Sequence, residues 1–104
     1  MTWWDHRGSQ EWAQYDFKTP AKVSAVEVYW FDDTGHGGCR VPASWRLLYR
    51  DGDAWKPVES ASNFEIKRDA CNRVTFNAVT TSALRIEVQL RERFSGGILQ
   101  WKVE

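Results

Sequence analysis

The sequence predicts an all-β protein, an antiparallel β-sandwich of the jelly-roll type. Apolar and polar residues alternate with a period of two in several segments, as in strands that bury one face. No segment shows apolar residues at the 3.6-residue spacing of an amphipathic helix. A chain of 104 residues can bury one hydrophobic core, so we expect roughly six to eight short strands in a single domain covering residues 1–104.

The first two predicted strands lie before a glycine-rich loop. In residues 13–17, Ala, Tyr and Phe alternate with polar residues, and this strand ends at the turn-like "KTPAK" around Pro20. The second strand covers residues 23–30, in which Val26, Val28 and Trp30 share one face, with Trp30 turned toward the core.

The remaining strands follow that loop. "SWRLLYR" alternates cleanly, and an Asp-Gly turn signal then leads to a return strand that begins at Trp55. Residues 63–72 predict only a weak strand and a loop. Strands are expected at "RVTFNAV", at "ALRIEVQLR" and finally at "ILQWKVE", where Leu99, Trp101 and Val103 are predicted to share one face.

Charge and hydropathy restrict the partners. Fourteen basic and fourteen acidic residues give zero net charge, which argues against nucleic acid and makes a membrane an unfavourable partner. No segment has the length and apolarity of a membrane span or the pattern of a signal peptide. Because Met1 leads directly into two tryptophans, we expect the chain to be an amino-terminally truncated piece of a larger protein.

The sequence offers no good enzyme hypothesis. It contains no recognisable serine nucleophile arrangement and no phosphate-binding glycine loop. Asp32 and Asp33 are adjacent at a strand end, so their side chains point in opposite directions and are poorly placed to act on one bond. With His36 they provide too few ligands for a metal, and we expect no cofactor. Cys39 and Cys71 are compatible with one disulfide bond or with two free thiols.

Three polar and aromatic segments are candidate binding loops. The longest, "YWFDDTGHGGCRVP", contains Asp32, Asp33, His36 and Arg40 beside aromatic residues. Charged groups can bond sugar hydroxyls and an aromatic ring can stack on the apolar face of a sugar, so this mixture suits glycan recognition. The alternative is an ordinary solvated turn built from Asp and Gly.

The second and third candidates are "TWWDHRG" and "RERFSGG". In the first, Trp3, Trp4 and His6 are close together, and we expect one of the two tryptophans to pack in the core. A histidine at such a position is more often a solvated loop residue than a ligand contact, and this is the alternative interpretation of His6. In the other, Arg93 and Phe94 belong either to the binding surface or to an ordinary hairpin tip.

The order of motifs resembles the coagulation-factor type C, or discoidin-like, family, which shares the galactose-binding-like fold with carbohydrate-binding module family 32. The resemblance rests on segments that cover nearly the whole chain. They are "EWAQYDFKTPAKVSAVEVYW", "SWRLLYRDGDAW", "VTFNAVTTSALRIEV" and "GGILQWKVE".

This resemblance implies a non-catalytic sandwich appended to a secreted bacterial glycoside hydrolase, such as a chitobiase-like or β-L-arabinofuranosidase-like enzyme. It implies a periplasmic or extracellular location. Sugar-binding members bind through loops at one end, where His6 and a neighbouring Trp would match a His and an aromatic residue. Asp32 and Asp33 stand where Arg is common, and residues 36–38 where Asn-Gly is common, so galactose preference is not implied.

Two functional hypotheses follow. In the first, Trp3 or Trp4 and Phe94 stack on a glycan while charged side chains bond its hydroxyls; that charged set is His6, Asp32, Asp33, His36, Arg40 and Arg93. In the second, the domain packs on the catalytic domain of its parent chain and binds no sugar. Family members often hold calcium through an opening strand and a closing Glu. This chain starts after that strand and has Lys102 near the Glu position, so we expect no calcium and an unpaired sheet edge.

Overall fold

The computed structural model describes residues 1–104 as five β-strands without a helix. The strands are β1 (Gln10–Phe31), β2 (Ser44–Asp51), β3 (Ala54–Pro57), β4 (Cys71–Gln89) and β5 (Gly97–Val103). They form one antiparallel sheet in the order β3-β2-β4-β1-β5, which confirms the predicted all-β antiparallel class. The chain forms no helix that is long and apolar enough to cross a membrane.

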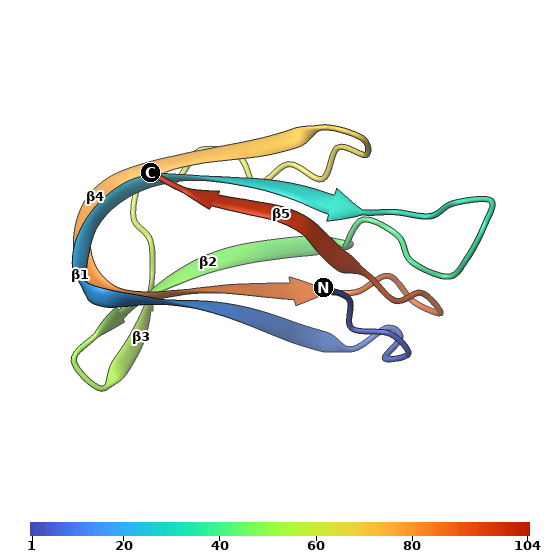
Figure 1. The fold of residues 1–104 in the computed structure, drawn as a ribbon, viewed down its shortest axis with the longest axis horizontal. Helices are drawn as coiled ribbons and strands as arrows, with labels where there is room; N and C mark the ends of the chain where they lie inside the picture. The colour runs from blue at the N-terminus through green and yellow to red at the C-terminus, as the bar shows by residue number, and fades with distance from the viewer.

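The sheet becomes a sandwich because β1 and β4 bend together at one end of the molecule (Figure 1). Residues 10–16 of β1 pair with residues 83–89 of β4 in one layer, which β2 and β3 extend. Past the bend, residues 21–29 pair with residues 71–81 in the other layer, which β5 completes.

The bend explains why five strands form where more were predicted. The expected break around Pro20 is a bend within β1, and "RVTFNAV" and "ALRIEVQLR" likewise merge into β4. The ladder passes from the pair Asp16 and Ala83 directly to the pair Ala21 and Thr81, leaving residues 17–20 unpaired. Proline has no N–H to donate, so it is tolerated in this unpaired stretch without ending the strand.

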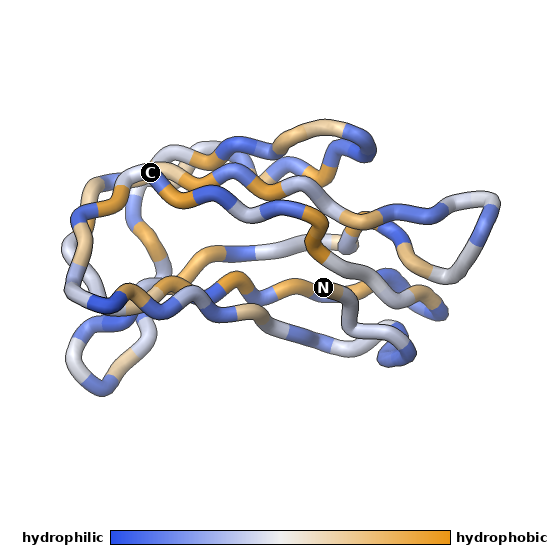
Figure 2. Tube along the Cα trace, viewed as in Figure 1, coloured by the Kyte–Doolittle hydropathy of each residue, from blue (hydrophilic) through white to orange (hydrophobic).

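The core lies between the layers as one cluster of 15 buried residues. In Figure 2 apolar and polar positions alternate along the strands, as expected when one face of each layer is buried. Trp30 is buried, as predicted, and its ring meets Trp45 edge to face at 5.2 Å between centroids. Trp45 in turn meets Phe64 at 4.9 Å, so three aromatic rings fill one part of the core.

The closing strand differs from the prediction at one residue. Tyr29 pairs with Gln100 and Trp30 pairs with Ile98, so Leu99 is an extra residue on β5. This bulge shifts the alternation, and Ile98 takes the core position while Leu99 is 62% exposed. The prediction that Leu99 shares a face with Trp101 and Val103 was therefore wrong.

The chain before β1 lies along part of the free edge of β5. The backbone N–H of Ile98 donates to the carbonyl of Met1 at 2.9 Å, and that of Trp3 donates to Gly96 at 2.9 Å. Beyond Ile98 no strand pairs with this edge, since β5 is the last strand in the sheet order. The edge is thus paired only near the loops.

The segment 63–72, predicted as a weak strand and a loop, forms no strand before β4 begins. Asn72, which is 2% exposed, links this segment to β1. Its Oδ1 accepts from the Lys67 N–H at 2.8 Å, while its Nδ2 donates to the Lys67 carbonyl at 3.1 Å and the Val28 carbonyl at 3.3 Å. Its Nδ2 also donates to the Ala70 carbonyl at 3.2 Å, so one buried amide bonds four backbone groups.

We predict that Asn72→Ala lowers the free energy of unfolding by about 2–3 kcal/mol, because it removes these bonds and leaves buried backbone groups unpaired. Urea unfolding followed by tryptophan fluorescence measures the loss. Asn77→Ala is the control, since Asn77 is exposed and makes one long side-chain bond of 3.3 Å to Ser60. A similar loss in both variants would contradict the assigned role of Asn72.

Candidate ligand-binding site at the loop end

Three segments meet at the loop end of the sandwich: residues 1–9, residues 32–43 between β1 and β2, and residues 90–96 between β4 and β5 (Figure 1). Backbone hydrogen bonds join them. The N–H of Ser95 donates to the Gly38 carbonyl at 2.9 Å, and the N–H of Arg40 donates to the Ser95 carbonyl at 3.1 Å. The N–H of Gly8 donates to the Phe94 carbonyl at 3.1 Å. Residues 90–96 therefore bond both of the other two segments.

A pocket of about 280 Å³ opens between the first two segments. Its lining residues are Thr2, Trp4, Phe31, Asp33, Gly37, Gly38 and Cys39. Trp4 is 54% exposed and Phe31 is partly buried, so both present apolar surface beside the Asp33 carboxylate. This combination of flat apolar walls and one fixed polar group is typical of small-molecule sites, although the volume is slightly below their usual range of about 300–1,000 Å³.

The two glycines at 37 and 38 allow side chains to approach the loop closely. A Cβ on Gly38 would lie 2.8 Å from Cζ3 of Trp4, and a Cβ on Gly37 would collide with Oδ2 of Asp33. Any larger residue at either position would displace the indole or the carboxylate from the pocket.

Asp33 offers one bonded and one free carboxylate oxygen. Its Oδ1 accepts from the Cys39 N–H at 2.7 Å and lies 3.6 Å from Nη1 of Arg40. Its Oδ2 has no hydrogen-bond partner within the protein. The bonds to Oδ1 fix the side chain, so Oδ2 can accept a hydrogen bond from a ligand in the pocket.

Asp32, predicted as a ligand-binding residue, does not line the pocket. Its Oδ1 accepts from the N–H of Thr34 at 3.0 Å and from the Thr34 hydroxyl, and its Oδ2 accepts from the N–H of Val41 at 3.0 Å. Partial burial by itself raises the pKa of Asp32, but these hydrogen bonds outweigh it, and the pKa lies below its ordinary value. Asp32 therefore links Thr34, near the start of the loop, to Val41, near its end.

Arg40 and Phe94 are brought together, but outside the pocket lining. The guanidinium carbon of Arg40 lies 4.4 Å from the centre of the Phe94 ring. Nη1 of Arg40 also donates to the carbonyls of Gly37 and Cys39, each at 2.8 Å. Phe94 is half-buried, and Arg40 covers one of its ring faces.

The remaining predicted residues lie apart from the pocket lining. Of the two tryptophans, Trp3 packs against the core, and its Nε1 donates to the Trp12 carbonyl at 3.2 Å. Nδ1 of His6 lies 2.6 Å from Glu11, whose hydrogen bond and charge raise the histidine pKa above 6.5. His36 and Arg93 are exposed and make no side-chain hydrogen bond or ion pair.

Of the predicted set, the structure therefore brings Trp4 and Asp33 into one pocket. Sequence reasoning did not assign binding roles to Thr2, Phe31, Gly37, Gly38 or Cys39, which also line it. The position of Phe31 immediately before the glycine loop was the available clue. Cys39 is buried and Cys71 exposed, and both thiols are free; burial and the nearby Asp33 raise the pKa of Cys39.

No three His, Cys, Asp or Glu side chains gather closely enough to hold a metal ion. The absence of calcium stays a prediction.

These features define the class of the protein: an antiparallel β-sandwich with a small pocket built from loops gathered at one end. The chain belongs to the F5/8 type C domain family, which matches residues 2–101. This confirms the resemblance seen in the motifs. The domain of this family is a non-catalytic binding module.

Solved structures share the fold at low sequence identity. A structure of the beta-galactosidase BgaA from Streptococcus pneumoniae superposes with a TM-score of 0.79 at 18% identity, over 90% of this chain and 68% of that chain. Chitosan-binding module 1 from the chitosanase/glucanase of Paenibacillus sp. IK-5 superposes with a TM-score of 0.69 at 15% identity, over 94% of this chain and 71% of that chain. A selenomethionine-labelled mutant of that module gives 0.68 at 14% identity, over 93% and 70%.

We predict that Asp32→Asn lowers stability at pH 7 by about 1 kcal/mol, because an amide cannot accept all the bonds that the carboxylate accepts. The folded-state pKa is depressed, so the contribution of the carboxylate is present above pH 3.8 and is lost as the pH falls through the folded pKa. The difference from wild type should therefore shrink in acid. Urea unfolding at pH 7, 4 and 3 measures it.

Asp53→Asn is the matched control, because the Asp53 side chain is fully exposed. Its effect should stay within about 0.5 kcal/mol at each pH. A pH-independent loss in Asp32→Asn would contradict the proposed role of the charge.

Proposed function

We propose that the chain is a carbohydrate-binding accessory module of a bacterial glycoside hydrolase and that the loop-end pocket binds one sugar unit of a glycan. The observation that carries the proposal is the meeting of an exposed indole, Trp4, with the free oxygen of Asp33 in one pocket. Structural neighbours with a sugar-related role, a chitosan-binding module and a beta-galactosidase, support it.

The chemistry suits a pyranose ring. Its axial C–H face is apolar and stacks on an indole, while its hydroxyls donate hydrogen bonds that a carboxylate accepts strongly. Arg7 lies 4.7 Å from the centre of the Trp4 ring and helps to orient it. The Asp33 carboxylate repels anionic sugars, so the proposed ligands are neutral or amine-bearing glycans.

The parent enzyme and the location belong to the same proposal. A chitobiase-like or β-L-arabinofuranosidase-like hydrolase is the proposed parent, and the module acts in the periplasm or outside the cell, where polymeric glycans are found. The catalytic domain of that chain is then its covalent partner.

A purely structural module is the competing proposal. Three of the predicted binding residues favour it, because their side chains make contacts within the protein. These residues are Asp32, Arg40 and Phe94. Such a module would fold normally and bind no sugar.

We predict that Trp4→Ala weakens glycan binding about tenfold, the loss of roughly 1.4 kcal/mol of stacking. Asp33→Asn should weaken binding similarly, because the amide keeps a carbonyl for Cys39 and loses the charge. Isothermal titration calorimetry with galactose, N-acetylglucosamine and a tetramer of glucosamine measures both.

His36→Ala is the control, because His36 lies on the same loop, is exposed and does not line the pocket. Its affinity should equal that of wild type. Equal weakening in all three variants would contradict the pocket, and a folded wild-type protein that binds none of the three sugars would favour the structural module.

A further inference from the structure

The outer face of the layer that contains β2 has polar side chains in two rows across the strands. In the row nearer the loops, Gln89 of β4 pairs with Gln10 on one side and Ser44 on the other. In the next row, Glu87 pairs with Trp12 and Arg46 in the same way. Alternate residues share a face, and the intervening Trp45 and Val88 are buried, so both rows lie on the outer surface.

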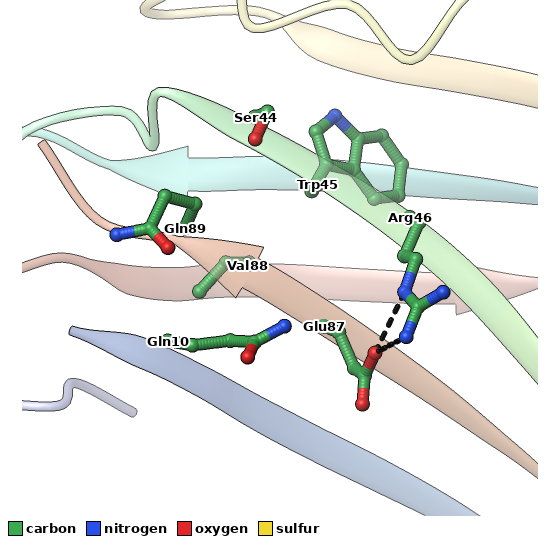
Figure 3. A pocket seen from close by; sticks show the side chains of 7 residues that line it. All are labelled: Gln10, Ser44, Trp45, Arg46, Glu87, Val88 and Gln89. Atoms are coloured by element: carbon green, nitrogen blue, oxygen red, sulfur yellow. Dashed lines mark hydrogen bonds and ion pairs between the residues drawn. The ribbon is translucent and has the colours of Figure 1, made fainter.

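These rows border a shallow groove of about 220 Å³. Figure 3 shows Gln10, Gln89, Glu87 and Arg46 around it, on three neighbouring strands. None of its lining residues lines the loop-end pocket, so the groove is a separate feature of the surface.

The groove contains hydrogen-bonding groups that the protein leaves free. Oε1 of Glu87 accepts from Nε of Arg46 at 2.7 Å, and this pair leaves Oε2 of Glu87 and Nη1 of Arg46 without protein partners. The Gln10 amide and the Ser44 hydroxyl also make no side-chain hydrogen bond. Hydrogen-bond donors and acceptors therefore both face the groove. Its two charged side chains, Arg46 and Glu87, have opposite charges and give no net charge.

Trp12 adds a rigid aromatic surface beside this groove. It is 54% exposed, and it pairs with Glu87 near the start of β1. The guanidinium carbon of Arg85 lies 4.3 Å from the ring centres of both Trp12 and Trp55, and Arg85 donates to Gln14 at 2.9 Å. Arg85 is held between two indoles and so fixes the Trp12 ring before any ligand arrives.

We infer that this groove and Trp12 form a second binding site, for a neutral oligosaccharide of at least two sugar units. A sugar ring on Trp12 would lie next to Glu87, with the following unit over Gln10 and Gln89, because alternate residues on a strand are about 6.6 Å apart. The cancelled charge of the Arg46–Glu87 pair favours neutral hydroxyl-rich ligands over anionic polymers. Because the side chains stand on paired strands, no backbone segment has to become ordered on binding.

The test is a two-dimensional NMR titration of the ¹⁵N-labelled chain with cellotetraose and with chitotetraose. We expect shifts of the Trp12 indole N–H, the Gln10 and Gln89 amides and the Arg46 Nε–H. Trp12→Ala should weaken this binding about tenfold and leave any shifts of Gly38 and Cys39 at the loop-end pocket unchanged. Arg46→Ala tests the same groove independently if Trp12→Ala does not fold.

Tyr15→Ala is the matched control, an exposed aromatic on the same strand whose ring contacts Phe17 and Trp101. Its affinity at the groove should be that of wild type. Shifts confined to the loop-end pocket would overturn the second site and leave the proposed function standing. Shifts confined to the groove would support the second site and glycan binding, and would contradict only the assignment of the loop-end pocket. Groove shifts that persist unchanged in folded Trp12→Ala and Arg46→Ala would also overturn the second site.

Discussion

The structure depends on the pairing of β1 with β4, which continues on both sides of a shared bend. Because the two strands fold back together, each contributes to both layers, and the sheet closes its apolar face against itself. The same bend returns the end of β1 to the end of the molecule where β1 began (Figure 1). Residues 1–9 and 32–43 are neighbours for this reason, and the end of β4 places residues 90–96 beside them. The loop-end pocket is thus a consequence of the bend.

Most charged residues of the long loop order the pocket without facing it. Asp32 bridges the two ends of its loop, and Arg40 bonds two loop carbonyls while covering Phe94. These bonds hold the backbone around Gly38, against which Trp4 packs closely. A glycine-rich loop without them would have to be ordered by the ligand, at a cost in conformational entropy. Asp32 and Arg40 therefore order the loop that forms one wall of the pocket.

Alternation along the chain was enough to predict the strand segments, chain length predicted a single core, and the mixture of polar, glycine and aromatic residues marked the three candidate loops. It could not predict that two pairs of strands would merge, because a bend with an unpaired stretch around Pro20 depends on the partner strand. The bulge at Leu99 has the same origin, since only the pairing with Tyr29 and Trp30 shows the extra residue. Asp32 and Asp33 are chemically identical in sequence, and the path of the loop alone determines which oxygen is free.

The loop-end pocket and the outer-face groove differ in what holds them. Trp4 and Asp33 are supported by backbone bonds between loops, whereas the groove side chains stand on strands whose register is set by the whole β1–β4 ladder. The Gln89 side chain lies between the two, since it borders the groove and its Nε2 donates to the Gly8 carbonyl at 3.0 Å. Gly8 belongs to the segment that carries Trp4. A ligand that drew the Gln89 amide into the groove would break its hydrogen bond to Gly8. The loss of that bond would destabilise the loop segment 1–9, whereas the strand pairing of the sheet would be unchanged.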